Sequence, residues 1–282
     1  MNLELPEKEK IPKKRIIWYI VIILICILAI AVVIGVQILG NDIVDNLFGI
    51  SKITRRSEEE EATLKANFET IFDNNVQDDE NYKAQKIYKD KELVYTDYTK
   101  EEQKEKYDIN VNLPYINIKN VAVEKFNNEI KNSFQGKAEE ILNTQEKNII
   151  YTVKYKATID NNKLSLIIYS DLKQETSAQR IIIQTFNYDL ESNKELTLED
   201  ILNNYEIKKN DVQDKINKDI KEEQRKAEEL KELGYNIFSR DVNSEIYKVE
   251  NITEYFVYNN NIYIIFAYGN DKITSEMDLV II

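Results

Sequence analysis

An uninterrupted apolar run near the start of the chain is the feature that most limits how this protein can fold. Residues 16–39, IIWYIVIILICILAIAVVIGVQIL, contain no charged side chain. A helix of this length spans about 36 Å, and the hydrocarbon core of a bilayer is about 30 Å thick. A globular domain offers no surface position to a helix that is apolar on every face. The run therefore predicts a transmembrane helix over residues 16–39.

Basic residues predict the orientation of this helix. Five Lys or Arg residues lie within residues 1–15, and the next basic residue after the run is Lys52. Since positive charge stays on the cytoplasmic side, residues 1–15 form a cytoplasmic tail and the C-terminal part is extracytoplasmic. The alternative is a cleaved signal peptide, because Ala29-Ile30-Ala31 resembles a cleavage site. The apolar run continues past it, so we expect an uncut, single-pass anchor that contacts membrane lipid in the cell membrane.

Composition excludes several classes of chemistry. The chain has no histidine, and its single cysteine, Cys26, lies inside the apolar run. Nucleophiles activated by histidine and histidine-ligated metal sites are therefore excluded, as is an intramolecular disulfide. We predict no catalytic residue, no cofactor and no metal, and thus no enzyme. An exported protein without disulfides is typical of a Gram-positive-type bacterium.

The charge balance bears on partners. The formal net charge is −12, and residues 1–15 contribute five basic and three acidic side chains, or +2, which leaves −14 on the rest. An acidic exported part favours a cationic partner, or simply solubility, and argues against nucleic acid. The sequence does not predict an oligomeric state.

Residues 40–107 read as a juxtamembrane helix and a linker. Ser57 and the glutamates after it have the form of a helix start. Apolar residues from Leu64 to Phe72 then recur at helical spacing, so this helix is either a stalk or docks on the domain. Residues 74–91 are polar and predict a loose linker.

The rest of the chain predicts an α+β fold of antiparallel sheet with two long packed helices. Alternating residues predict strands at 93–99, 108–113, 149–159, 164–169, 181–190, 252–258, 262–268 and 276–282. The first long helix follows a possible N-cap at Asn120, and the second covers residues 210–233 and stops at Gly234. We expect no βαβ alternation, and we expect Pro114 at a strand end.

Two groups of side chains outside the apolar run are candidates for binding. Asp211, Asp214 and Asp219 fall on the second long helix, where a solvated face is the favoured interpretation over a metal site. Tyrosines are dense in the predicted strands, where a structural role in the core is the favoured interpretation over an aromatic platform for sugars or peptides. These tyrosines are Tyr151, Tyr155, Tyr169, Tyr188, Tyr255, Tyr258, Tyr263 and Tyr268.

Residues 185–202, TFNYDLESNKELTLEDIL, hold five carboxylates in a short stretch. A strand end, a turn and a helix cap account for each of them locally. Thr197 followed by Asp200 has the pattern of an N-cap with acids near the positive end of a helix. We therefore interpret Asp189, Glu191, Glu195, Glu199 and Asp200 as structural.

The same stretch resembles a motif of the bacterial domain of unknown function 3298, through Asp189, Lys194, Leu196, Thr197, Leu198, Asp200 and Leu202. Upstream, NVNLPYINIKNVAVEKFNNEI resembles the start of its companion, domain of unknown function 4163. YFVYNNNIYIIFAY resembles the closing hairpin of the pair. The resemblance implies a first extracytoplasmic subdomain over residues 108–190, like 4163, and a second over residues 191–282, like 3298.

The resemblance implies recognition outside the cytoplasm. Relatives include RsiV-type anti-sigma factors, whose exported part binds lysozyme, and deacetylases that carry the pair beside a catalytic domain. Fifteen cytoplasmic residues cannot form a sigma-binding domain, and no deacetylase domain is present. We expect a binding or sensor-like module for lysozyme or cell-wall material. Alternatives are an envelope hydrolase with paired carboxylates and a structural partner of a membrane complex.

Overall fold

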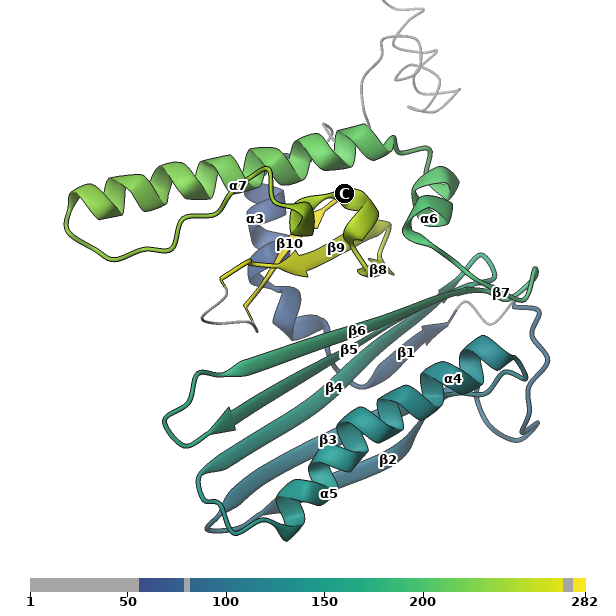
Figure 1. Ribbon diagram of the computed structural model, residues 1–282. Helices are drawn as coiled ribbons and strands as arrows, with labels where there is room; N and C mark the ends of the chain where they lie inside the picture. Colours follow the sequence, from purple (N-terminus) through teal and green to yellow (C-terminus); the bar gives the residue numbers. More distant parts are fainter. Residues whose placement is uncertain (1–55, 79–81, 271–275) are drawn as a thin grey trace, which may run out of the picture. The chain divides into compact units, whose positions relative to one another are not determined.

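The computed structural model describes residues 56–78, 82–270 and 276–282, and these all belong to one compact unit. The predicted transmembrane run, residues 16–39, lies outside the described residues. Within them, no helix combines the length and the apolar character needed to cross a membrane. The described fold is α+β, with sheets in which antiparallel pairs predominate, as the strand and helix patterns predict (Figure 1).

A large first sheet carries most of the strands, in the order β2-β3-β4-β5-β6-β7, with β1 added beside β4. Most neighbours pair antiparallel, and the residues with positive φ are Asn161 and Asn162 in the β4–β5 turn and Glu175 in the β5–β6 turn. The strands are β1 (Asn75–Asp78), β2 (Val94–Gln103), β3 (Tyr107–Ile116), β4 (Ile149–Asp160), β5 (Lys163–Gln174), β6 (Arg180–Asp189) and β7 (Lys194–Glu195).

The expectation of no βαβ alternation is wrong in one place. Strands β3 and β4 are parallel, with Tyr107 opposite Ile149 and Val111 opposite Val153. The first long helix connects them, because parallel neighbours need a crossover of a dozen residues or more. The strand predictions did not contain this unit, because the alternation of apolar and polar residues within a strand does not reveal whether its partner runs parallel or antiparallel.

The predicted loose linker at residues 74–91 also needs correction. Strand β1 lies within it and pairs in parallel with β4, from Asn75 opposite Lys156 to Asp78 opposite Ile159. Asn74 starts the pairing, because its backbone N–H donates to the carbonyl of Tyr155 at 2.9 Å. Tertiary pairing thus orders a segment whose polar composition favours no structure.

The first long helix packs across one face of this sheet. It consists of α4 (Val121–Ile130), the π-helical turn η3 (Lys131–Gln135) and α5 (Gly136–Asn143). Asn120 is the N-cap, as predicted, and its side chain accepts from the backbone N–H of Ala122. From Phe126 to Ala138 the apolar residues are four positions apart, which is more than the 3.6 residues of an α-helical turn. In a continuous α-helix they would drift around the helix, and the wider π turn keeps them on the face that packs against the sheet. The apolar residues Phe126, Ile130, Phe134, Ala138 and Ile141 are all buried.

A second layer covers the opposite face of the first sheet (Figure 1). Its small sheet has the order β10-β9-β8, and its long helix α7 is the predicted second helix. Among the described residues the elements are α3 (Glu58–Ala66), η2 (Phe68–Ile71), α6 (Leu198–Asn204), α7 (Lys209–Glu232), η4 (Glu245–Tyr247), η5 (Val249–Asn251), β8 (Glu254–Tyr258), β9 (Asn261–Ala267) and β10 (Met277–Ile281).

Strand β5 shows how the sequence serves both layers. Leu166 and Ile168 face the core beneath α4 and α5, whereas Ile167 and Tyr169 face the core of the second layer. Successive side chains of a strand point to opposite faces, so a strand with both faces covered is apolar throughout. Phe68 and Phe72 join the second core, which shows that the helix after Ser57 docks on the domain.

A buried arginine, Arg240, links helix α7 to strand β10 within the second layer. One guanidinium nitrogen of Arg240 donates to Glu223 of α7 and to Asp278 of β10, both at 2.6 Å. The planar group also lies over the ring of Tyr247, whose hydroxyl donates to the carbonyl of Tyr268. Gly269 has φ of +95°, and a Cβ there would lie 2.3 Å from the Tyr247 hydroxyl, so only glycine fits.

Pro114 lies two residues before the end of β3, close to its predicted position at a strand end. The strand continues to Ile116 because Pro114 faces a register shift in β2, between Thr96 and Tyr98. The parallel ladder with β4 has already ended at Val111. Pro114 has no backbone N–H to donate, and at this position neither β2 nor β4 forms a regular hydrogen-bond ladder with β3.

Polar side chains join the two layers. None of the described strands pairs with the outer edge of β8, and side chains on the face of the first sheet bind its backbone instead. Ser165 accepts from the N–H of Val257 at 2.9 Å, and Thr158 donates to the carbonyl of Val257 at 2.8 Å. Asn187 donates to the carbonyl of Tyr255 at 2.8 Å.

We predict that Asn187→Ala lowers the free energy of unfolding by about 1–3 kcal/mol, the loss expected when buried partners are left unsatisfied. Asn187 also accepts from the Ser165 hydroxyl at 2.5 Å, so two groups lose a partner. Urea denaturation measures the change. Asn110→Ala, at an exposed position of β3, is the control and should stay within about 0.5 kcal/mol of wild type. Equal stability of the two variants would contradict this role.

Candidate functional site

The carboxylate-rich stretch runs from β6 into helix α6, which lies between two hollows. Asp189 ends β6 and accepts from the backbone N–H groups of Glu191 and Ser192 at 2.9 and 2.8 Å, which closes the predicted turn. Thr197 is the N-cap of α6 and forms a reciprocal capping box with Asp200. These hydrogen bonds from Thr197 hold the pKa of Asp200 below its usual value. The turn role of Asp189 and the cap role of Asp200 are as predicted, whereas Glu195 and Glu199 are exposed and line a hollow beside α6.

One hollow lies between α6, the β4–β5 hairpin and β8, and has a volume of about 190 Å³. We call it the polar hollow, because hydroxyl, amide and charged groups dominate its wall. Burial, and then the charge of Asp160, raise the pKa of Tyr205 at its edge. Its lining includes Thr158, Asp160, Lys163, Ser165, Asn187, Asn204, Tyr205 and Asn260. Several of these groups already bind the backbone of β8, which limits what the hollow can recognise.

The other hollow lies on the far side of α6 and is larger, about 550 Å³. We call it the acidic hollow. Its buried apolar side chains are Leu198, Leu202, Val249 and Ile252. Three exposed carboxylates, those of Glu195, Glu199 and Glu250, and one exposed ammonium, that of Lys209, also line it.

The electrostatics of the acidic hollow are dominated by its carboxylates. Lys209 pairs with Glu250 at 3.4 Å. A hydrogen bond from its own backbone lowers the pKa of Glu250 most, and the positive charge of Lys209 lowers it further. Burial, and then the charge of Glu195, raise the pKa of Tyr255 to about 12. Since one cation faces three anions, the hollow retains negative charge and suits a cationic group with an apolar stem.

Glu254 is the carboxyl group that burial affects most clearly beside these hollows. One oxygen accepts from the backbone N–H of Thr185 at 2.7 Å and from the Thr185 hydroxyl at 2.9 Å. Burial raises the pKa of Glu254, and the hydrogen bonds from Thr185 offset this only in part. Sequence patterns did not single out Glu254, because its burial arises where β8 meets β6.

We predict that acidification stabilises the wild type relative to Glu254→Gln. With a raised pKa, folded Glu254 takes up a proton before the unfolded chain does, as pH falls from neutral toward the ordinary value of about 4.3. The wild-type free energy of unfolding should therefore rise relative to that of the variant in this interval. Urea denaturation at a series of pH values measures the difference. A difference that stays constant, or falls on acidification, would contradict the assignment.

Most of the tyrosines in the predicted strands belong to the core, which is the interpretation that the sequence favours. Tyr151, Tyr155, Tyr169, Tyr188 and Tyr263 are buried, in agreement with the structural interpretation. A separate row of accessible tyrosines lies at the β2–β3 edge and consists of Tyr88, Tyr95 and Tyr115. The sequence offers a signal for only part of it, since Tyr95 lies in a predicted strand, Tyr115 follows the predicted strand end at Pro114, and Tyr88 falls in the predicted linker.

The aspartates of α7 are solvated or paired. Asp219 binds the ammonium of Lys65 in α3, and Asp214 lines an open depression with Lys218 and Arg225. Throughout residues 56–78, 82–270 and 276–282, no group of three Asp, Glu or Cys side chains is arranged to hold a metal ion. The charges of α7 therefore serve its contact with α3 and with solvent.

Comparisons with known proteins add a structural neighbour. No protein-family model matches the chain, and no curated protein matches it. Among solved structures, it is similar to a DUF3298 family protein from Pseudomonas aeruginosa PAO1, with 15% sequence identity and a TM-score of 0.28. The match covers 35% of this chain and half the length of that one. The neighbour carries the family name that residues 185–202 resemble, and the TM-score is too low to support a shared fold or function.

Proposed function

We propose that the protein is a membrane-anchored, extracytoplasmic binding module of the cell envelope that recognises a cationic protein. The anchor is the apolar run over residues 16–39, and the export of the domain follows from the basic residues that precede it. The paired 4163-like and 3298-like subdomains, and the likeness to RsiV-type ectodomains, belong to this proposal. The observation that carries it is the acidic hollow.

The acidic hollow has the chemistry of a receptor for Lys or Arg side chains. Its buried apolar residues, such as Leu202 and Val249, can cover an aliphatic stem, while the exposed Glu195 and Glu199 meet the charged end. The net charge of −12 adds a field that attracts cationic proteins and speeds their association. Lysozyme, the ligand that the resemblance implies, is a suitable cationic probe.

We predict that Glu195→Gln combined with Glu199→Gln weakens lysozyme binding by about fivefold at low salt, because two rim charges are lost. The Lys209–Glu250 pair stays intact in this variant. The measurement is titration of the full-length protein, in detergent, with hen lysozyme at two salt concentrations. The effect should shrink as salt rises.

The matched control removes two glutamates from an exposed part of α7. Glu228→Gln combined with Glu232→Gln makes the same change in net charge at residues that do not line the acidic hollow. If both double variants weaken binding equally, general charge attraction explains the binding and the hollow does not. If the wild type does not bind lysozyme, the proposed partner class is wrong.

Hydrolysis by paired carboxylates is the alternative that the geometry favours less. Glycoside chemistry needs two acids flanking a bound sugar, one of them with a raised pKa. Glu254 has the raised pKa, but both of its oxygens accept hydrogen bonds from threonines, including Thr185. Its hydrogen bonds join β8 to β6, which supports a structural role. A structural partnership within a membrane complex remains compatible with the anchor.

The proposed topology gives its own prediction. In sealed vesicles whose cytoplasmic face is outward, added protease should leave residues 40–282 intact, because the bilayer shields them. Immunoblotting for the C-terminal domain measures the protection, and detergent should abolish it. Destruction of the domain in sealed vesicles would contradict export.

A further inference from the structure

A row of three tyrosines, Tyr88, Tyr115 and Tyr95, forms a second surface that the acidic hollow does not include. We call it the tyrosine strip. The ring centroids of Tyr88 and Tyr115 are 6.4 Å apart, and those of Tyr115 and Tyr95 are 5.5 Å apart. Tyr115 lies in the middle because its ring contacts both others. Neighbouring rings are tilted by 47° and 40°, so the strip twists along its length.

The strip is accessible yet firmly held. Tyr88 is 49% exposed, and Tyr95 and Tyr115 are half-buried as a directly opposed pair on β2 and β3. The side chain of Asn117 is fully buried and forms hydrogen bonds with both the backbone N–H and the carbonyl of Tyr88. It accepts from the Tyr88 N–H at 2.8 Å and donates to the Tyr88 carbonyl at 2.8 Å. The backbone that carries the row is therefore already ordered, so a ligand does not have to order it on binding.

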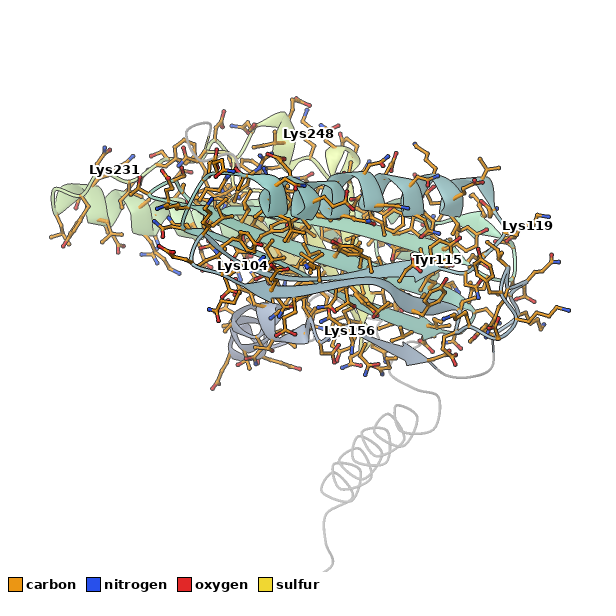
Figure 2. The ribbon with its side chains drawn as sticks, turned by 90° about the horizontal axis from the view of Figure 1, so that it is seen from below. Lys104, Tyr115, Lys119, Lys156, Lys231 and Lys248 are labelled. Carbon is orange, nitrogen blue, oxygen red and sulfur yellow. The ribbon has the colours of Figure 1, made fainter. Side chains whose placement is uncertain are left out.

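Charges of both signs surround the strip. The ammonium of Lys91 lies 5.2 Å from the centre of the Tyr95 ring. Figure 2 shows Tyr115 and Lys119 toward one end of the first sheet and Lys104 toward the other. The carboxylates of Asp90 and Asp97 act on Tyr95, and those of Asp97 and Glu124 act on Tyr115.

This mixture selects the chemistry of the ligand. The carboxylates of Asp90, Asp97 and Glu124 disfavour a polyanion, and a ligand here must also supply acceptors for the Lys91 ammonium and donors for those carboxylates. A neutral sugar chain meets both requirements, because its hydroxyl and amide groups accept from ammonium and donate to carboxylate. The C–H faces of its rings pack on aromatic rings, whose faces carry partial negative charge.

We propose that the tyrosine strip binds a neutral, β-linked N-acetylhexosamine glycan of the cell-wall type, with successive sugar rings on Tyr88, Tyr115 and Tyr95. The inference rests on the proposed extracytoplasmic location, which places the strip on the side of the membrane where such glycans occur. It assigns wall glycan to the strip and the cationic protein to the acidic hollow.

The test titrates full-length protein with soluble chitin oligosaccharides by calorimetry, in a detergent without a sugar headgroup. We expect saturable binding that Tyr88→Ala and Tyr115→Ala each weaken by about fivefold, as expected for one lost aromatic contact. Tyr115→Phe keeps the ring and should bind nearly as well as wild type. Tyr235→Ala is the matched control, because Tyr235 is 60% exposed beyond the end of α7.

The outcomes separate the two surfaces. The Glu195→Gln/Glu199→Gln variant should keep glycan binding while losing lysozyme affinity, and Tyr88→Ala should do the reverse. If the wild type does not bind the glycan, the inference about the tyrosine strip is wrong, whereas the proposal that the acidic hollow binds a cationic protein is unaffected. Equal effects of Tyr88→Ala and Tyr235→Ala would overturn it too. Should Tyr115→Ala not fold, Tyr88→Ala decides, because its ring is exposed and its backbone remains held by Asn117.

Discussion

The hydrogen bonds that attach strand β8 to the face of the first sheet are the interaction on which the rest of the domain depends. An open strand edge normally pairs with another strand or with water. Here Ser165, Asn187 and Thr158 supply the missing partners from the side-chain positions of other strands. The second layer is thereby held in a defined register, and the apolar core around Phe256 and Ile167 forms beside it.

Both candidate surfaces follow from this attachment or from the sheet that it covers. Helix α6 lies next to the junction, so its two sides become walls of the polar and acidic hollows. The tyrosine strip lies on the outer strands β2 and β3, away from the junction, where Tyr95 and Tyr115 stay accessible. One domain thus presents an apolar hollow rimmed by carboxylates and a separate row of accessible aromatic rings, which suit different ligands.

Sequence patterns predicted the elements far better than their partners. The period of the stripe from Phe126 to Ile141 identified the first long helix, but the π turn that keeps the stripe facing the core was not predicted. Capping by Thr197 and Asp200 was predictable because the contact spans three residues. The parallel pairing of β3 with β4, the strand β1 and the burial of Glu254 were not, because each depends on residues far apart in the chain.

The sequence by itself determined the apolar run over residues 16–39, the absence of histidine chemistry, the helix caps and the alternation of the strands. These properties are local, since each depends on residue type and on spacing within a few turns. The tertiary structure decided which tyrosines are core and which form the strip, and it turned the carboxylates near α6 into the rim of a hollow. Accessibility and charge balance arise when distant segments meet, and for that reason only the folded chain reveals them.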